Sequence, residues 1–310
     1  RLSPKLDRFI APGTLPEQIA SGYNWAEGPC WVGSAEEGYL VWSDVPENTA
    51  YWWSEATGAQ VFLRPSGFTG ESFTGRESGS NGLLQDTDGS LILCQHGDRR
   101  VARLRSPAPG VEPIFETIAD SYNGKRFNSP NDIIRHQSGD LYFTDPPYGL
   151  PGGQFDTISR EIDFEGVYRV RPADGTVTLL AKELKRPNGL VFTPDYQRLI
   201  VANSDREHPV YQQYPVGPDG TLGAGTLFFD AAPLVAAGGR GMPDGMAMHS
   251  SGHLFATGPG GVLVFTPAGE HIGTVRTGLS TANCTLAPDE RMLYITADSL
   301  ILRLPLLEAK

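Results

Sequence analysis

Six polar side chains stand at equivalent places in the sequence, each at the head of a short apolar segment. A typical copy is NGLLQDTDGSLILCQHGD from Asn81, in which an apolar strand, a polar turn and a second apolar strand follow the polar residue. This order is typical of a β-hairpin. The six heads are two carboxylic acids and four carboxamides: Glu27, Asn81, Asn131, Asn188, Asp244 and Asn283.

This set of side chains suits a hard divalent cation if the heads converge in space. Carboxylate and amide oxygens are the ligands that Ca²⁺ prefers, whereas Zn²⁺ prefers His or Cys and Mg²⁺ keeps more water in a stricter octahedron. We therefore expect Ca²⁺, with Mg²⁺, Mn²⁺ and Zn²⁺ as alternatives. The competing interpretation is that the Asn-Gly and Asp-Gly pairs at three heads are ordinary turns. Turn chemistry alone does not explain why one register recurs in all six segments.

The elements that would bring the heads together are repeated β-strands. Third and fourth apolar strands follow most hairpins, as in GVYRV from 166 and VTLLA from 177. Four strands in each of six units predict an all-β fold, a six-bladed β-propeller with four antiparallel strands per blade, whose first strands line a central channel. The last unit lacks a fourth strand, so we expect the segment 15–20 to complete it and close the ring. A single domain then spans 1–310, with 1–14 as an N-terminal extension.

Composition and charge limit the partners of this chain. Its 36 Asp and Glu residues against 25 Lys and Arg give a net charge of -11, which repels phosphate backbones and anionic membranes. We therefore expect a small-molecule partner, no nucleic acid and no membrane, and a monomer or a homodimer. The three cysteines lie far apart in apolar strands, so buried thiols are expected. Because the chain begins at Arg1, an exported or periplasmic location is slightly favoured over a cytoplasmic one.

Several motifs together resemble the gluconolactonase and regucalcin family. They are WAEGPCW, NSPNDI, LYFTDPPYG, RPNGLVF, PDGMA and ANCTLAPDERMLYIT, and they span nearly the whole chain. The segments QHGDRRV, GKRFNSPND and DPPYGL are similar to the bacterial gluconolactonase branch. The resemblance implies a propeller that holds a catalytic divalent cation and hydrolyses a sugar lactone such as glucono-1,5-lactone. It carries the metal ligands onto four of the six heads: Glu27, Asn131, Asn188 and Asp244.

The resemblance also suggests how the ester would be opened. Asp244 is the family's usual candidate for general base or nucleophile. A carboxylate on a dication has a lowered pKa and is a weak base, so two alternatives stay open. Either metal-activated water reacts while Asp244 only orients it, or His96 removes the proton. The competing interpretation of His96 is a solvent-exposed residue in a β-turn.

Long insertions at 64–80, 121–127 and 145–164 are expected to wall the mouth of the channel. They and the ring supply the candidates for substrate contacts: Asn131, Arg126, Tyr148, Asp145 and Asn81. The alternative for the loop residues is that they only hold long loops in place. Two other functions remain open on the same scaffold. One is an esterase or phosphotriesterase similar to diisopropylfluorophosphatase, and the other is a propeller that binds a ligand without catalysis.

Overall fold

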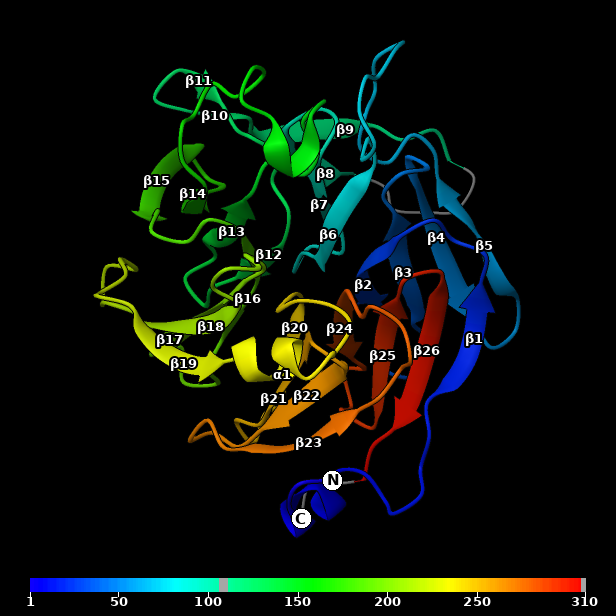
Figure 1. Cartoon of the computed structure of the whole chain (residues 1–310). Helices are drawn as coiled ribbons and strands as arrows, with labels where there is room; N and C mark the ends of the chain where they lie inside the picture. The colour runs from blue at the N-terminus through cyan, green and yellow to red at the C-terminus, as the bar shows by residue number, and fades with distance from the viewer. Residues whose placement is uncertain (106–110, 308–310) are drawn as a thin grey trace.

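The computed structural model describes residues 1–105 and 111–307, and these residues form almost exclusively β-structure. Six four-stranded antiparallel sheets are arranged around a common centre, with the first strand of each sheet nearest the centre (Figure 1). The predicted six-bladed β-propeller is therefore confirmed. Within the described residues, none of the helices combines the length and the apolar character needed to cross a membrane.

The strands follow one another outward in each blade. The first three blades consist of β2 (Ala26–Val32), β3 (Tyr39–Asp44), β4 (Thr49–Ser54) and β5 (Gly58–Leu63); β6 (Ser80–Gln85), β7 (Leu91–Gln95), β8 (Arg100–Leu104) and β9 (Phe115–Ala119); and β12 (Ile133–Arg135), β13 (Leu141–Asp145), β14 (Gly166–Arg171) and β15 (Thr176–Ala181). The next two consist of β16 (Pro187–Phe192), β17 (Arg198–Asn203), β18 (Val210–Pro215) and β19 (Thr226–Asp230); and β20 (Met246–Met248), β21 (Leu254–Gly258), β22 (Gly261–Phe265) and β23 (His271–Val275).

The sixth blade joins the two ends of the chain. It contains β24 (Asn283–Leu286), β25 (Met292–Ala297), β26 (Leu300–Pro305) and, from the N-terminal region, β1 (Glu17–Ser21). β1 pairs antiparallel with β26, with Ser21 opposite Leu300 and Glu17 opposite Arg303. The predicted closing strand is thus confirmed. It spans residues 17–21, whereas the sequence predicted 15–20. Closure leaves β26 with a partner on each side instead of an open edge.

The hydrophobic core lies between neighbouring blades. The second strands β7, β13 and β21 are buried at every residue because each is covered by the adjacent sheets. Separate apolar clusters fill each space between blades, for example the cluster of Val41, Phe62 and Leu93 between the first two. The three cysteines are buried and unpaired, as expected. Stacking of this kind fixes each first strand relative to its neighbours.

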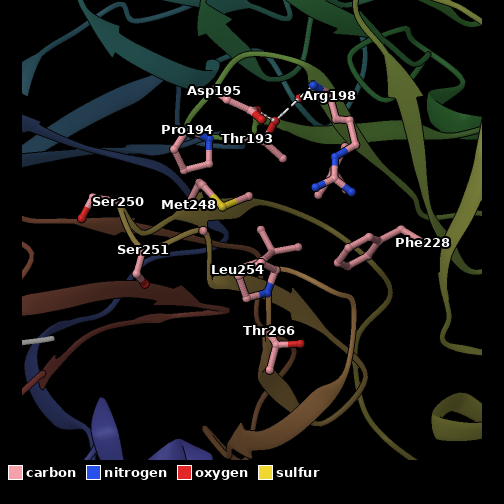
Figure 2. Close-up of a pocket in the computed structure, with 13 residues that line it drawn as sticks. Thr193, Pro194, Asp195, Arg198, Phe228, Met248, Ser250, Ser251, Leu254 and Thr266 are labelled. Carbon is pink, nitrogen blue, oxygen red and sulfur yellow. Dashed lines mark hydrogen bonds between the residues drawn. The ribbon is translucent and has the colours of Figure 1, made fainter. Parts of the chain in front are cut away.

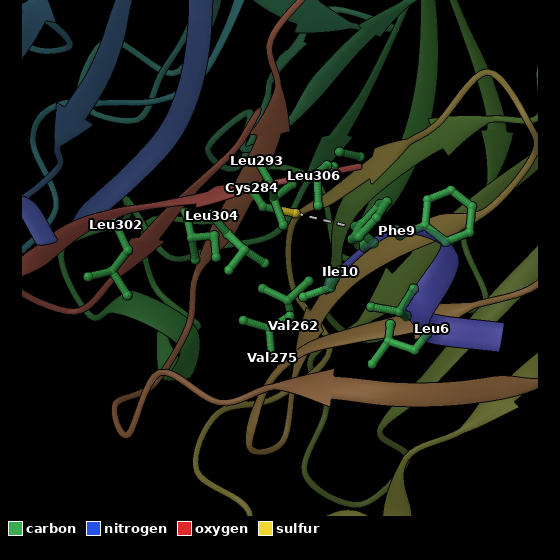
Figure 3. Packing of buried hydrophobic residues seen from close by; sticks show 14 of the residues in the cluster. Leu6, Phe9, Ile10, Val262, Val275, Cys284, Leu293, Leu302, Leu304 and Leu306 are labelled. Carbon is green, nitrogen blue, oxygen red and sulfur yellow. Dashed lines mark hydrogen bonds between the residues drawn. The ribbon is translucent and has the colours of Figure 1, made fainter. Parts of the chain in front are cut away.

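The N-terminal extension packs against the fifth and sixth blades. It contains a short 3₁₀ helix, η1 (Pro4–Arg8), and the side chains of Leu6, Phe9 and Ile10 are buried in a cluster with residues of both blades (Figure 3). The backbone N–H of Leu2 also donates to the carbonyl of Ile272, 3.1 Å away. Two further short elements connect blades: the two-stranded ribbon of β10 (Ser121–Tyr122) and β11 (Lys125–Arg126), and α1 (Ala232–Ala236). The 3₁₀ helix η2 (Gly153–Phe155) lies within the third blade, between β13 and β14.

Candidate functional site

The six heads lie at the same end of the first strands, and at three of them the pairing with the second strand is irregular. The register of β2, β6 and β16 shifts just at Glu27, Asn81 and Asn188. Such β-bulges bend the strand and re-aim a side chain. Asn131 and Asp244 precede β12 and β20, and their N–H groups donate to the carbonyls of Thr144 and Thr257 at 2.8 and 3.0 Å.

The glycines of the Asn-Gly and Asp-Gly pairs, which follow Asn81, Asn188 and Asp244, allow close contact between blades. A Cβ on Gly82 would lie 2.7 Å from the carbonyl oxygen of Asn131, and one on Gly189 would lie 2.3 Å from that of Asp244. A Cβ on Gly245 would lie 1.9 Å from Cγ of Asn283. None of the three glycines has a positive φ, and Gly82 and Gly189 lie inside strands. The interpretation of these dipeptides as turns is therefore wrong, and each glycine lets the next head approach.

A cavity of about 820 Å³ opens at this end of the channel. Five of the six heads line it: Glu27, Asn81, Asn131, Asn188 and Asp244. Loop residues form its walls, among them Glu77, Tyr148 and Phe155. The sixth head, Asn283, is not part of the lining, and its Oδ1 accepts the backbone N–H of Cys284 at 2.8 Å. The structure thus brings the proposed ligands together in one cavity.

Two acceptor oxygens of the residues that line this cavity have no hydrogen-bond donor. Oδ1 of Asn131 and Oδ1 of Asp244 are buried and lack a hydrogen-bond partner. The carboxylate of Glu27 accepts from Nε1 of Trp25 and from the N–H of Gly28, each at 3.2 Å. Buried acceptors normally find a donor, so the unpaired oxygens point to a missing positive partner. Amide and carboxylate oxygens are the ligands that a hard cation prefers. The described residues contain no cluster of three or more His, Cys, Asp or Glu side chains arranged for a metal.

The carboxylates of the channel destabilise one another's charged form. Burial, with smaller repulsion from Asp132 and Glu77, raises the pKa of Glu27 to about 8. Burial first, then repulsion from Glu27, Asp132 and Glu77, raises the pKa of Asp244 well above its ordinary value. Burial also raises the pKa of Asp132 to about 7. A bound dication would reverse these shifts by favouring the ionised forms.

The sequence analysis did not identify two of these acids, Asp132 and Glu77, as parts of the site. Asp132 directly follows Asn131, and this adjacency in the segment SPND is the signal that could have found it. Glu77 lies in the insertion 64–80, where the sequence offers no comparable signal. Glu77 lines the cavity, and the start of its insertion is held at the first blade by three N–H groups that donate to Oδ1 of Asn48.

His96 does not occupy an exposed turn, and that interpretation is wrong. Its side chain is fully buried, behind the cavity rather than in its lining. Nε2 lies 3.5 Å from Nδ2 of Asn131, and Nδ1 lies 3.2 Å from Oε2 of Glu77. The ring therefore lies between Glu77 and Asn131, one of the candidate ligands, and its side chain is not exposed.

The candidates for substrate contacts divide into two groups. Asn81, Asn131 and Tyr148 line the cavity, and burial raises the pKa of the Tyr148 phenol. Asp145 and Arg126 lie outside the lining. The two carboxylate oxygens of Asp145 accept the N–H groups of Asn128 and Ser129, each at 2.8 Å, while Nη2 of the exposed Arg126 donates to the carbonyl of Asp98 at 3.0 Å. In this structure both residues hold loops, which was the alternative interpretation.

A second, smaller cavity of about 270 Å³ lies at the other end of the strands, between the fourth and fifth blades (Figure 2). Phe228, Met248 and Leu254 form apolar parts of its wall, and the side chains of Asp195 and Arg198 lie at its edge. It shares no lining residue with the larger cavity. It therefore has no direct part in the chemistry of the ring.

Comparisons with known proteins agree with this arrangement. The family described as SMP-30/gluconolactonase/LRE-like region matches residues 25–299. A gluconolactonase of Zymomonas mobilis is 37% identical over 317 residues, covering 98% of this chain and 84% of that protein. The solved structure of a gluconolactonase from Xanthomonas campestris is 27% identical with a TM-score of 0.83, covering 98% of this chain and 93% of that one. A regucalcin from Agrobacterium tumefaciens, at 18% identity, a TM-score of 0.72 and coverage of 96% of each chain, shares the fold.

Proposed function

Because this chain belongs to the SMP-30/gluconolactonase/LRE-like family and is a lactone hydrolase, we propose that it opens glucono-1,5-lactone or a similar aldonolactone with the help of a divalent cation. One observation carries the cation part of this proposal. Oδ1 of Asn131 and Oδ1 of Asp244 are buried without donors in the cavity that Glu27 and Asn188 also line. Unpaired acidic and amide oxygens at one place are costly unless a cation binds them.

Glu27, Asn131, Asn188 and Asp244 would hold this cation. The set combines two carboxylates with two amide oxygens, which favours Ca²⁺; Mg²⁺, Mn²⁺ and Zn²⁺ are the alternatives to be compared. Four protein ligands also leave room in a coordination shell of six to eight oxygens for water and substrate. When bound, the cation would polarise the ester carbonyl and stabilise the negative charge that develops on its oxygen.

The chain's own residues supply orientation and proton transfer. Asp244 is the proposed general base, because it lines the cavity and one of its carboxylate oxygens has no hydrogen-bond partner. Water forms a new C–O bond to the carbonyl carbon, and the ring C–O bond then breaks. The leaving alkoxide takes up the proton that Asp244 removed from the water, which gives a hydroxyl group and a carboxylic acid that ionises in solution. His96 is less suited to this task because its buried ring nitrogens face Asn131 and Glu77. Asn81 and Tyr148 line the cavity at positions where they can hydrogen-bond sugar hydroxyls.

Metal removal tests this proposal directly. The purified chain is treated with a chelator, and turnover of glucono-1,5-lactone is measured after addition of Ca²⁺, Mg²⁺, Mn²⁺ or Zn²⁺ singly, corrected for spontaneous hydrolysis. We expect turnover to fall to the uncatalysed rate on chelation and to return with Ca²⁺. Full turnover in the chelated protein would refute the role of the cation. No turnover with any of the four would refute the proposed substrate and favour another ester or a phosphotriester.

A further inference from the structure

The two candidate amide ligands share a feature beyond the ring itself. A side-chain amide has a donor end and an acceptor end, and only the oxygen end can bind a cation. Nδ2 of Asn188 donates to Oγ of Ser204 at 3.0 Å, and the Ser204 hydroxyl donates in turn to the carbonyl of Pro243 at 2.6 Å. Ser204 therefore accepts from Asn188 and keeps the nitrogen end of that amide away from the other ligands.

His96 takes the corresponding place behind Asn131. Its Nε2 lies 3.5 Å from Nδ2 of Asn131, while Oδ1 of Asn131 is left without a partner. A neutral imidazole carries a proton on one nitrogen only, so the tautomer decides whether Nε2 accepts or donates. If Nε2 carried the proton, the amide would turn its oxygen toward His96 and present its NH₂ group to the ligands.

Glu77 selects the tautomer that leaves Nε2 as an acceptor. Its Oε2 lies 3.2 Å from Nδ1 of His96; this is a close polar contact, and among the described residues Nδ1 has no aligned hydrogen bond. A carboxylate accepts hydrogen bonds but does not donate them, so the contact is favourable when the proton is on Nδ1. Metal-binding histidines are commonly oriented by a carboxylate in this way. Here the carboxylate of Glu77 orients His96, which does not bind the metal itself but contacts the candidate ligand Asn131.

The surroundings prevent the imidazole from turning away. The side chain of His96 is completely buried, and the backbone N–H of His96 donates to the carbonyl of Gly79 at 3.1 Å. Gly149 packs directly against it, since a Cβ on Gly149 would lie 2.5 Å from Cβ of His96. The ring is thus fixed by packing as well as by its polar contacts.

We propose that Glu77 and His96 are positioning residues that hold Asn131 with its Oδ1 directed into the cavity for the divalent cation. This inference rests on the proposed function, because it concerns how one of the cation's ligands is oriented. Neither residue needs to touch the substrate. The effect is therefore on cation affinity first and on turnover only through it.

A double-mutant cycle on Ca²⁺ binding separates orientation of the amide from general support of the fold. Calorimetry with Ca²⁺ alone is performed on the chelator-treated protein. His96→Phe should weaken Ca²⁺ binding by about 10- to 100-fold, the usual effect of losing a residue that orients a metal ligand. In an N131D background the same substitution should change Kd by about twofold or less, because both ends of a carboxylate are oxygen and need no orientation. Equal weakening in both backgrounds would overturn the proposal.

A second pair of variants tests Glu77, whose side chain is partly exposed and less important for folding. E77Q keeps an oxygen that can accept from Nδ1 and should stay within about threefold of the wild-type Kd, whereas E77M should weaken binding by about tenfold or more. Thermal melting of each metal-free variant shows that it is folded. Equal Ca²⁺ affinity of E77M and the wild type would refute the role of Glu77.

If the wild type binds Ca²⁺ and opens the lactone but H96F binds equally well, the positioning role is wrong and the proposed function stands. A wild type that binds none of Ca²⁺, Mg²⁺, Mn²⁺ and Zn²⁺ would refute both the positioning role and the cation part of the proposed function.

Discussion

Gly189 of the fourth blade lies so close to Asp244 of the fifth that a Cβ at position 189 would be 2.3 Å from the backbone carbonyl oxygen of Asp244. Gly189 directly follows the proposed ligand Asn188, and the contact places it against the backbone of the proposed ligand Asp244. Because the obstructing atom belongs to the backbone, no side-chain rotation can relieve the clash. The spacing of the ligands across blades therefore depends on a residue that has no side chain.

Gly189→Ala should accordingly weaken the site as well as the fold. We expect a loss of about 1–3 kcal/mol in the free energy of unfolding, as for other overpacked sites, together with weaker Ca²⁺ binding and lower turnover. Urea unfolding and calorimetry measure the two effects. Gly70→Ala is a matched control, since a Cβ there would meet only the far end of the Phe68 ring, which can move. Unchanged cation affinity in G189A would show that the contact does not set the ligand spacing.

Gly189 and Glu77 show which features of the fold and the site could be predicted from the sequence and which could not. The repeated register placed the strand heads, the six blades and the closing strand correctly, because hairpins at a fixed spacing leave a periodic trace. The role of Gly189 could not be read in the same way, since an Asn-Gly pair looks the same in a turn and at a close contact. Glu77 left no trace, because the path of its insertion depends on Oδ1 of Asn48, a contact between loops with no periodicity. For Asp145 the position after a second strand suggested a substrate contact, but its oxygens accept from two backbone N–H groups.

Asp244→Asn should nearly abolish turnover without unfolding the protein. Removal of a general base typically lowers the rate by about 100-fold or more. The metal-free variant should be at least as stable as the metal-free wild type, because the pKa of Asp244 is raised by burial and by its acidic neighbours, so its charge is unfavourable in the folded chain. Turnover with Ca²⁺ present and urea unfolding without it measure these effects. Asp289→Asn, in an exposed turn, provides the control for loss of one negative charge. Wild-type turnover in D244N would remove Asp244 from the catalytic assignment.

Stability should decrease on the acidic side through His271. This residue packs between Phe229 and Phe265, with ring centroids 5.7 and 5.2 Å away, and burial lowers its pKa below the ordinary 6.5. The unfolded chain therefore takes up a proton at higher pH than the folded chain does. The contribution of His271 is fully present above pH 6.5 and is lost as the pH falls through the lower, folded value.

His271→Phe removes this titration while keeping an aromatic ring in the same place. Urea unfolding at pH 7.5 and at pH 5 should show a larger loss of stability on acidification for the wild type than for H271F. Other histidines titrate in both proteins and cancel in the comparison. An identical loss in the two proteins would mean that burial of His271 does not disfavour its charged form.

Phe9 should support the fold without supporting the site. Only 2% of its side chain is exposed, and its ring lies against His249, His253 and Phe255 at the end of the fifth blade away from the cavity. Phe9→Ala should cost about 3–5 kcal/mol of stability, the usual range for removing a buried phenylalanine. Leu2→Ala, at a side chain that is 68% exposed, should cost little by comparison. Because the first strands keep their places while the blades stay folded, Kd for Ca²⁺ and turnover of folded F9A at 25 °C should match the wild type. A weaker cation affinity in folded F9A would show that the extension couples to the ring through the fifth blade.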